Sequence, residues 1–169
     1  MADETTTCEL IGNLIKDEMR LDDGQVMIYD ERFPIPKDKR LYITIGMMDV
    51  APYANNTRTL TDDSGNLIEL QSLNQTETIS INAYSASDEA RERKHEIIMA
   101  LNSTRAQQVC EQHSMHIGRL PTTFNDATYL ETTAMLSRFA ITIRVHRLYT
   151  KEKPIEYYDE FSKSLLTNP

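Results

Sequence analysis

Three segments of the chain alternate between apolar and polar residues. In the segment 41–48, every second position is apolar: Leu41, Ile43, Ile45 and Met47. The segment 76–84 repeats the pattern with Ile79, Ile81 and Ala83, and the segment 136–149 with Phe139, Ile141, Ile143 and Val145. Because successive side chains of a strand point to opposite faces, each segment predicts a strand with one buried face. Shorter strands are predicted over 25–30 and 115–120.

Three other segments repeat their apolar residues at every third or fourth position, which predicts helices over 9–19, 88–101 and 104–113. Thr6 precedes Glu9 by three residues, a capping-box pattern at the start of the first helix. Ser85 and Ser87 are candidate capping residues for the second helix, which can start at Ser87 itself.

The segment 49–78 shows neither period clearly. Its only strong signal is the turn sequence DDSGN at 62–66, between two β-prone runs at 57–61 and 67–70. A stretch of roughly 25 residues with little core character is unusual in a compact domain and is often functional. The segment therefore predicts a protruding β-hairpin or arm.

Strands with one apolar face beside amphipathic helices indicate a fold of the α/β class. We expect a single mixed, mainly antiparallel β-sheet, with the helices packed on one face and the arm protruding. The chain of 169 residues suits one domain, which we assign to residues 1–154, with the arm at about 49–78 and a C-terminal tail at 155–169.

The composition is that of an ordinary soluble protein, with 40% hydrophobic and 26% charged residues. No apolar run approaches the roughly 20 residues that span a bilayer, and the start of the chain lacks a signal-peptide pattern. Cys8 and Cys110 have no framework spacing, so we expect reduced thiols and a cytoplasmic site of synthesis.

The charge pattern argues against general nucleic-acid binding, because the net charge is -8. The basic string at 91–95 alternates with acidic residues, and the pairs Glu89–Arg93 and Glu92–His95 lie one helical turn apart. We therefore expect a solvated helix face over a packed stripe, with the stem of Lys94 filling a gap in that stripe.

Candidate chemistry is sparse. Cys110, His113 and His116 are weak candidates for a metal site, because a structural zinc site usually needs four ligands and His116 follows the predicted helix end. The chain has no nucleophile elbow and no glycine-rich phosphate loop. We predict that the protein is not an enzyme, with no catalytic residues and no cofactor.

The second half of the chain has a distinctive order of elements. A strand ending in Tyr84 and Ser85 leads into a helix that starts at an acidic turn, and the segment IGRLP follows at 117–121. Arg138 and Phe139 then open the last strand, LSRFAITIRVHRLY at 136–149. This layout resembles the tail terminator (neck terminator) proteins of long-tailed bacteriophages, and the first helix and the strand at 41–48 also fit. The resemblance covers most of the chain, but its motifs are structural and include no catalytic residue.

The resemblance implies a structural virion protein of the tail or neck, assembled in the host cytoplasm. Such proteins form a ring, usually a hexamer, at the head-proximal end of the tail tube, where they stop tube polymerisation and offer a docking face to the head connector. The implied partners are further copies of the chain, the tail tube protein, a connector or neck protein and, as a further candidate, the sheath protein. DNA passes through the lumen without specific binding, and no membrane is involved.

Uneven charge suggests which surfaces of such a ring meet. The segment 41–81 has five acidic residues and one basic residue, whereas 138–169 has six basic and four acidic residues. We expect these surfaces to meet between subunits, or between ring and tube, through Asp62, Asp63, Glu69, Arg138, Arg144 and His146, with Asp49 and Glu77 as further acidic members. A second hypothesis is an acidic wall around the lumen, which would keep DNA from sticking.

Three other interpretations stay open at the level of sequence. The first is another head–tail joining or neck subunit with the same fold and partners. The second is a small metal-dependent enzyme built around Cys110, His113 and His116. The third is a host-encoded adaptor with no phage role.

Overall fold

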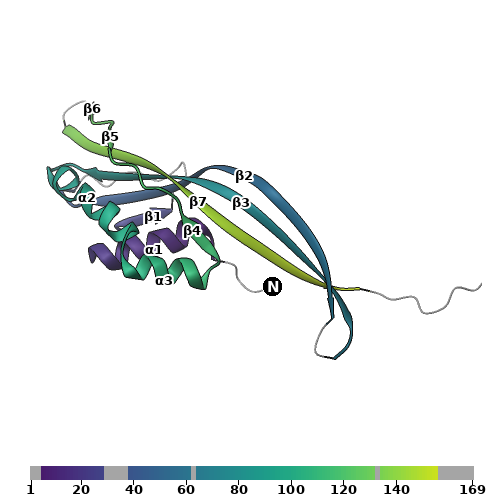
Figure 1. Ribbon diagram of the computed structural model, residues 1–169. Helices are drawn as coiled ribbons and strands as arrows, with labels where there is room; N and C mark the ends of the chain where they lie inside the picture. Colours follow the sequence, from purple (N-terminus) through teal and green to yellow (C-terminus); the bar gives the residue numbers. More distant parts are fainter. Residues whose placement is uncertain (1–4, 29–37, 62–63, 132–133, 156–169) are drawn as a thin grey trace, which may run out of the picture.

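The computed structural model describes residues 5–28, 38–61, 64–131 and 134–155 (Figure 1). The helices of this part are α1 (Thr7–Met19), α2 (Glu89–Leu101) and α3 (Thr104–Gln112). The strands are β1 (Val26–Ile28), β2 (Tyr42–Thr61), β3 (Leu67–Ser85), β4 (Met115–Ile117), β5 (Asn125–Asp126), β6 (Tyr129–Glu131) and β7 (Ala134–Pro154). Part of the predicted strand at 25–30 and the tail 156–169 lie outside the described residues.

A single mixed sheet organises these elements, in the order β1-β2-β3-β7-β4. The short strands β5 and β6 also pair with β7. β1 runs parallel to β2, and every other pair is antiparallel, which confirms the expected mixed, mainly antiparallel sheet of an α/β fold. Figure 1 shows all three helices on the same side of the sheet, near one end of its long strands. None of the helices in the described part of the chain has the length and apolar character needed to cross a bilayer.

The core lies between the helices and this end of the sheet. The alternating residues predicted to point inward are buried there, except Met47, which is 42% exposed. Ile11, Leu14 and Ile15 of α1 and Ala90, Ile97 and Leu101 of α2 are buried there as well. None of the described helices covers the opposite face of the sheet, where Tyr42, Tyr84 and Leu136 form a small buried cluster. The described helices therefore pack on one face of the sheet.

The capping box of α1 forms as the sequence predicts. The Thr6 hydroxyl accepts a hydrogen bond from the Glu9 amide at 3.3 Å, and the Glu9 carboxylate accepts from the Thr6 amide at 2.7 Å. The Glu9 carboxylate also accepts from the Thr6 hydroxyl at 2.9 Å, and the two bonds that it accepts, first that from the Thr6 amide, lower the pKa of Glu9. Arg147 of β7 donates hydrogen bonds to the Thr7 hydroxyl and the Thr5 carbonyl, which holds the start of α1 beside the last strand.

Replacing Thr6 with alanine should reduce the free energy of unfolding by about 1 kcal/mol, because one amide of the first helical turn loses its acceptor. The pKa of Glu9 is lowered in the folded state, so its contribution is present near neutral pH and is lost as the pH falls through that lowered value. Chemical denaturation at neutral and acidic pH checks this. Thr6→Ser should retain most of the stability, and equal losses in both variants would contradict the role of the hydroxyl.

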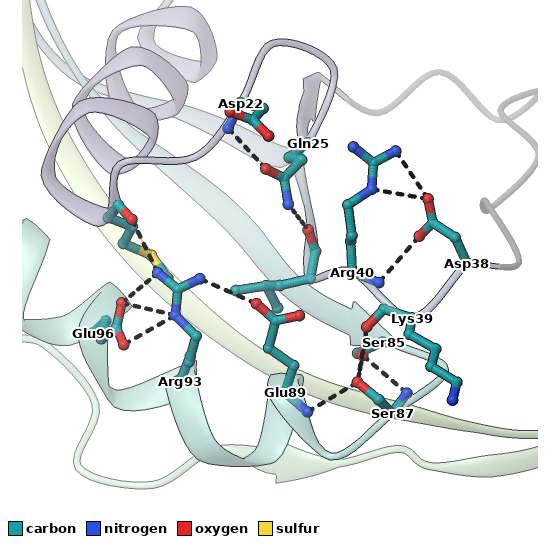
Figure 2. Close-up of polar contacts among 12 residues, drawn as sticks. Asp22, Gln25, Asp38, Lys39, Arg40, Ser85, Ser87, Glu89, Arg93 and Glu96 are labelled. Carbon is teal, nitrogen blue, oxygen red and sulfur yellow. Dashed lines mark hydrogen bonds and ion pairs between the residues drawn. The ribbon is translucent and has the colours of Figure 1, made fainter.

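Two serines join the start of α2 to the loop before β2 (Figure 2). The hydroxyls of Ser85 and Ser87 both donate to the carbonyl of Lys39, at 3.1 and 2.8 Å. The structure corrects their expected role: the N-cap is Asp88, whose side chain makes no capping bond, and Ser87 accepts only a 3.3 Å bond from the Glu89 amide. The main contact of both serines is therefore with the loop before β2, through the Lys39 carbonyl.

Arg93 carries the charge pairing of α2. Its guanidinium binds Glu89 at 3.2 Å and Glu96 at 2.8 Å, and it also donates to the Met19 carbonyl at the end of α1 at 2.9 Å (Figure 2). Lys94 lies over the Phe139 ring with its ammonium 3.9 Å from the ring centre. The predicted Glu89–Arg93 pair is confirmed, and Lys94 packs on the sheet, whereas Arg91 and His95 are exposed.

The long strands continue far beyond the helices and form a three-stranded ribbon (Figure 1). We define the ribbon as residues 49–61 of β2, 67–78 of β3 and 144–154 of β7, which pair without interruption by another strand. The arm expected at 49–78 is therefore not a lone hairpin, because β7 runs along it as a third strand. A third strand matters physically, since an isolated two-stranded hairpin is at best marginally stable in water.

Two irregularities explain why the sequence pattern fades where the ribbon begins. The register between β2 and β3 shifts between Met47 and Asp49 and again between Pro52 and Ala54, so Met48 and Tyr53 are extra residues. Each bulge moves the following side chains to the other face of the sheet. Beyond the base of the ribbon, where Glu77, Val145 and Arg147 are buried, no described helix covers it, so neither of its faces requires an apolar row there.

Candidate functional site

The ribbon exposes apolar side chains at its base. Every residue of β2 from Met47 to Thr61 is exposed, including Met48 at 64% and Tyr53 at 62%. Val50 lies between them in sequence, and Leu148 of β7 is exposed at the opposite edge of the ribbon. Large apolar side chains gathered on a protruding element are typical of a surface that contacts another macromolecule.

The uncovered face of the sheet carries the three basic residues that the sequence singled out. In the alternating pattern of β7, Arg138, Arg144 and His146 point away from the helix layer, whereas Ile141, Ile143 and Val145 are buried against it. The structure thus brings the three onto one face. Their surroundings differ, and this decides which of them can meet a partner.

Arg138 is engaged within the chain. It is half-buried, it donates to the Asn82 side-chain oxygen at 3.1 Å, and its guanidinium lies 5.3 Å from the centre of the Tyr84 ring. Its task is to cover the small apolar cluster on the open face.

His146 is also held by neighbours. Its Nδ1 lies 3.0 Å from the Thr76 hydroxyl, its ring meets Tyr53 edge to face, and it stacks on His116 with ring centres 6.3 Å apart. The hydrogen bond fixes the ring against the exposed Tyr53, so this histidine shapes the base of the ribbon.

Arg144 is the exposed member of the three. No ion pair of Arg144 occurs within the described ranges of the chain. In the sheet it lies opposite Thr78, which in turn lies opposite Asp49 of β2. One transverse row therefore has a carboxylate at one edge of the ribbon and a guanidinium at the other.

The acidic residues predicted for an interface differ in their position and exposure. Glu69 is half-buried in β3, between Thr59 of β2 and Lys153 of β7, and accepts a hydrogen bond from Gln71. Asp62 and Asp63 lie outside the described residues. Glu77 is only 2% exposed and belongs to the core, so its inclusion among the acidic surface residues was wrong.

Glu77 belongs to a buried polar group that sequence analysis missed. Its carboxylate accepts from the Tyr149 hydroxyl at 2.9 Å, and the Arg147 guanidinium lies 4.7 Å from the centre of the Tyr149 ring. Arg147, only 5% exposed, donates to the Thr7 hydroxyl at 2.9 Å and to the Thr5 carbonyl at 3.2 Å. A signal was present, because Arg147 and Tyr149 continue the inward-facing row that begins at Phe139.

The three weak metal candidates do not form a ligand set. Cys110 and His116 both line a shallow hollow between α3 and β4, but His116 stacks on His146, and His113 is the C-cap of α3. Within the described ranges, no three His, Cys, Asp or Glu side chains gather closely enough to hold a metal ion.

Neither thiol has the surroundings of a nucleophile. Burial raises the pKa of Cys110, and burial together with the nearby Glu77 carboxylate raises the pKa of Cys8. A reactive cysteine needs its pKa lowered by positive charge or a helix N-terminus.

A comparison with protein-family models and with curated proteins finds no match to this sequence.

Proposed function

We propose that this protein is a tail terminator, a structural subunit of a long-tailed bacteriophage. The observation that carries the proposal is the ribbon, which protrudes from a packed body without a core of its own and exposes apolar side chains at its base. Such a ribbon is well suited to contacts with neighbouring subunits. The resemblance of the order of elements to tail terminator proteins suggests that these neighbours are subunits of a phage tail.

In this proposal the chain forms a ring, most simply a hexamer, at the head-proximal end of the tail tube. The ring stops tube polymerisation and presents a docking face to the head connector or neck protein; the sheath protein is a further candidate partner. A heterologous ring suits a chain of this shape, because each copy must offer different surfaces to its two neighbours and to the layers above and below. DNA passes through the lumen without specific binding.

Replacing Arg144 with glutamate should weaken the ring, because Arg144 is the exposed basic residue of the open face and its row ends in Asp49 at the other edge. We expect the concentration needed for half-assembly to rise roughly tenfold at low salt and less at high salt, since exposed charge pairs are screened. Mass photometry of the purified protein over a dilution series measures this.

Arg91→Glu is the matched control, because it makes the same charge change at an exposed position of α2 on the helix side. Unchanged assembly of the Arg144→Glu variant at both salt concentrations would contradict the proposed interface. A wild-type protein that stays monomeric at all concentrations would contradict the ring itself.

A related candidate is another head–tail joining or neck subunit, which the same ribbon would serve equally well. The length of tail tubes separates the two, because only the terminator stops tube growth. The metal-dependent enzyme gains no support from the separate settings of Cys110, His113 and His116.

A further inference from the structure

Both long edges of the ribbon lack a neighbouring strand in the described part of the chain. β1 covers the outer edge of β2 only at Ile43–Ile45. On the other side, β4 covers the outer edge of β7 at Val145–Arg147, flanked by a hydrogen bond from the Gly118 amide to the Arg144 carbonyl and one from the Leu148 amide to the Ser114 carbonyl. Beyond Leu148, the edge of β7 has no partner strand in the described part of the chain. Unpaired edges of this kind present rows of backbone donors and acceptors to any strand that can align with them.

The outer edge of β2 is unsuited to strand pairing near the body but regular farther out. On β2, the bulged residues Met48 and Tyr53 and the proline at 52 hinder pairing, because bulges twist an edge and proline lacks a donor. Beyond them, from Ala54 to Thr61, the register with β3 is regular and Arg58 is the one charged residue. This regular stretch is the part of the edge suited to pairing.

The regular stretch of β2 lies level with the open stretch of β7. Asn55 of β2 shares a row with Tyr149 of β7, and Leu60 shares a row with Pro154, each through one residue of β3. Both strands are antiparallel to β3 and therefore run parallel to each other. When copies stand side by side with their ribbons aligned, β7 of one copy meets β2 of the next as a parallel pair. The outer edge of β2 already takes a parallel strand at its base, namely β1.

The charges at the two edges are complementary in this arrangement. Arg58 of β2, Leu70 of β3 and Glu152 of β7 form one transverse row on one face of the ribbon. Within a chain, β3 separates Arg58 from Glu152, but an aligned neighbour places them next to each other. In the adjacent row Lys153 would meet Thr59, so no like charges are brought together.

We infer that neighbouring copies of this chain pair edge to edge through their ribbons, with residues 149–154 of one copy parallel to residues 54–61 of the next. Glu152 of one copy then lies beside Arg58 of its neighbour. This inference rests on the proposed ring and specifies how its subunits meet. Every copy uses both edges of its ribbon, so a closed ring leaves neither edge unpaired. An 'isologous' dimer, by contrast, would pair two identical edges and leave the other edge of each copy open.

A cysteine pair tests the register directly. In the full-length chain with Cys110→Ser, the variant Arg58→Cys with Glu152→Cys should form disulfide-linked multimers under mild oxidation. The two positions in one chain are two strand spacings apart, about 10 Å, which is too far for a disulfide. Any such link therefore joins two copies. Thr59→Cys with Lys153→Cys, in the next row, is a second pair that should behave in the same way.

The single-cysteine variants decide between the arrangements. Arg58→Cys alone and Glu152→Cys alone should remain uncrosslinked. A crosslinked dimer from either would indicate that identical edges meet and would overturn the head-to-tail pairing. A folded double-cysteine protein, as judged by circular dichroism, that forms rings but no crosslinks with either pair would overturn the ribbon pairing and leave the ring intact.

A charge exchange tests the same contact without oxidation. Arg58→Glu should raise the concentration for half-assembly roughly tenfold, because it places two carboxylates side by side. Adding Glu152→Arg should restore assembly toward that of the wild-type protein. If the double variant assembles no better than the single one, the pairing of these residues is wrong. Crosslinking of both pairs in a protein whose loss leaves tail length unchanged would support the ribbon contact and refute the terminator role.

Discussion

Replacing Arg147 with methionine should lower the free energy of unfolding by about 3 kcal/mol, because it removes one of two opposite charges buried at the base of the ribbon. Arg147 and Glu77 are 5% and 2% exposed, and the Tyr149 side chain links them. Without the guanidinium, the buried Glu77 carboxylate loses the opposite charge that Tyr149 links to it, and the Thr7 hydroxyl and the Thr5 carbonyl lose their donor.

The same substitution should loosen the contact between α1 and the last strand. Arg147 holds residues at the start of α1 from a position on β7 that is 140 residues away in sequence. Burial raises the pKa of the Tyr149 hydroxyl, and its hydrogen bond to Glu77 raises it further, so this hydroxyl stays a donor near neutral pH. The donor bond keeps the ring of Tyr149 in place between the two charges.

Chemical denaturation of Arg147→Met, Glu77→Gln and the double variant measures the coupling. The glutamine keeps a side-chain oxygen for Tyr149 while it removes the charge, so the double variant should lose clearly less stability than the sum of the two single losses. Additive losses would show that the two charges are independent. Wild-type stability of Arg147→Met would contradict the structural role of the guanidinium altogether.

Much of the body could be predicted because its signals are local. The Thr6–Glu9 capping box needs only one turn of chain, and the pairing of Glu89 with Arg93 needs only helical spacing. The inward rows of the three long strands follow directly from alternation, since a buried face selects apolar residues at every second position.

The arm at 49–78 was predicted, but the third strand of the ribbon was not, for a physical reason. Beyond the buried residues at its base, the described helices cover neither face of the ribbon, so packing imposes no alternation, and the bulged residues Met48 and Tyr53 interrupt what periodicity remains. The extension of β7 to Pro154 is a long-range pairing with β3, which no local pattern reports. The turn sequence at 62–66 indicated a hairpin but not its third strand.

Charged residues were the hardest to assign. Counting charge by segment placed Glu77 on an acidic surface, although its position in the inward row beside Ile79 indicates burial. Arg138 shares a face with Arg144, as alternation predicts, but only the structure reveals its hydrogen bond to Asn82. Sequence periodicity therefore identifies the face of a strand, whereas contacts across strands decide which of its charges remain available.

In the proposed terminator role, loss of the protein should produce tail tubes of excessive and variable length, because nothing then stops polymerisation at the head-proximal end. The expected effect is large, since tube growth without a terminator is limited only by the supply of tube protein. Heads should accumulate without tails, as the docking face for the connector is missing. A neck subunit with another role would instead leave tubes of normal length that fail to join heads.

In the proposed role, electron microscopy of phage lysates prepared with and without the gene for this chain measures tube length most directly. The account predicts tubes of uniform virion length when the wild-type protein is supplied, and overlong tubes of variable length when it is absent. The folded variant Arg58→Glu should also give overlong tubes, and Arg91→Glu should not. Uniform tubes of normal length in the absence of the protein would contradict the terminator function.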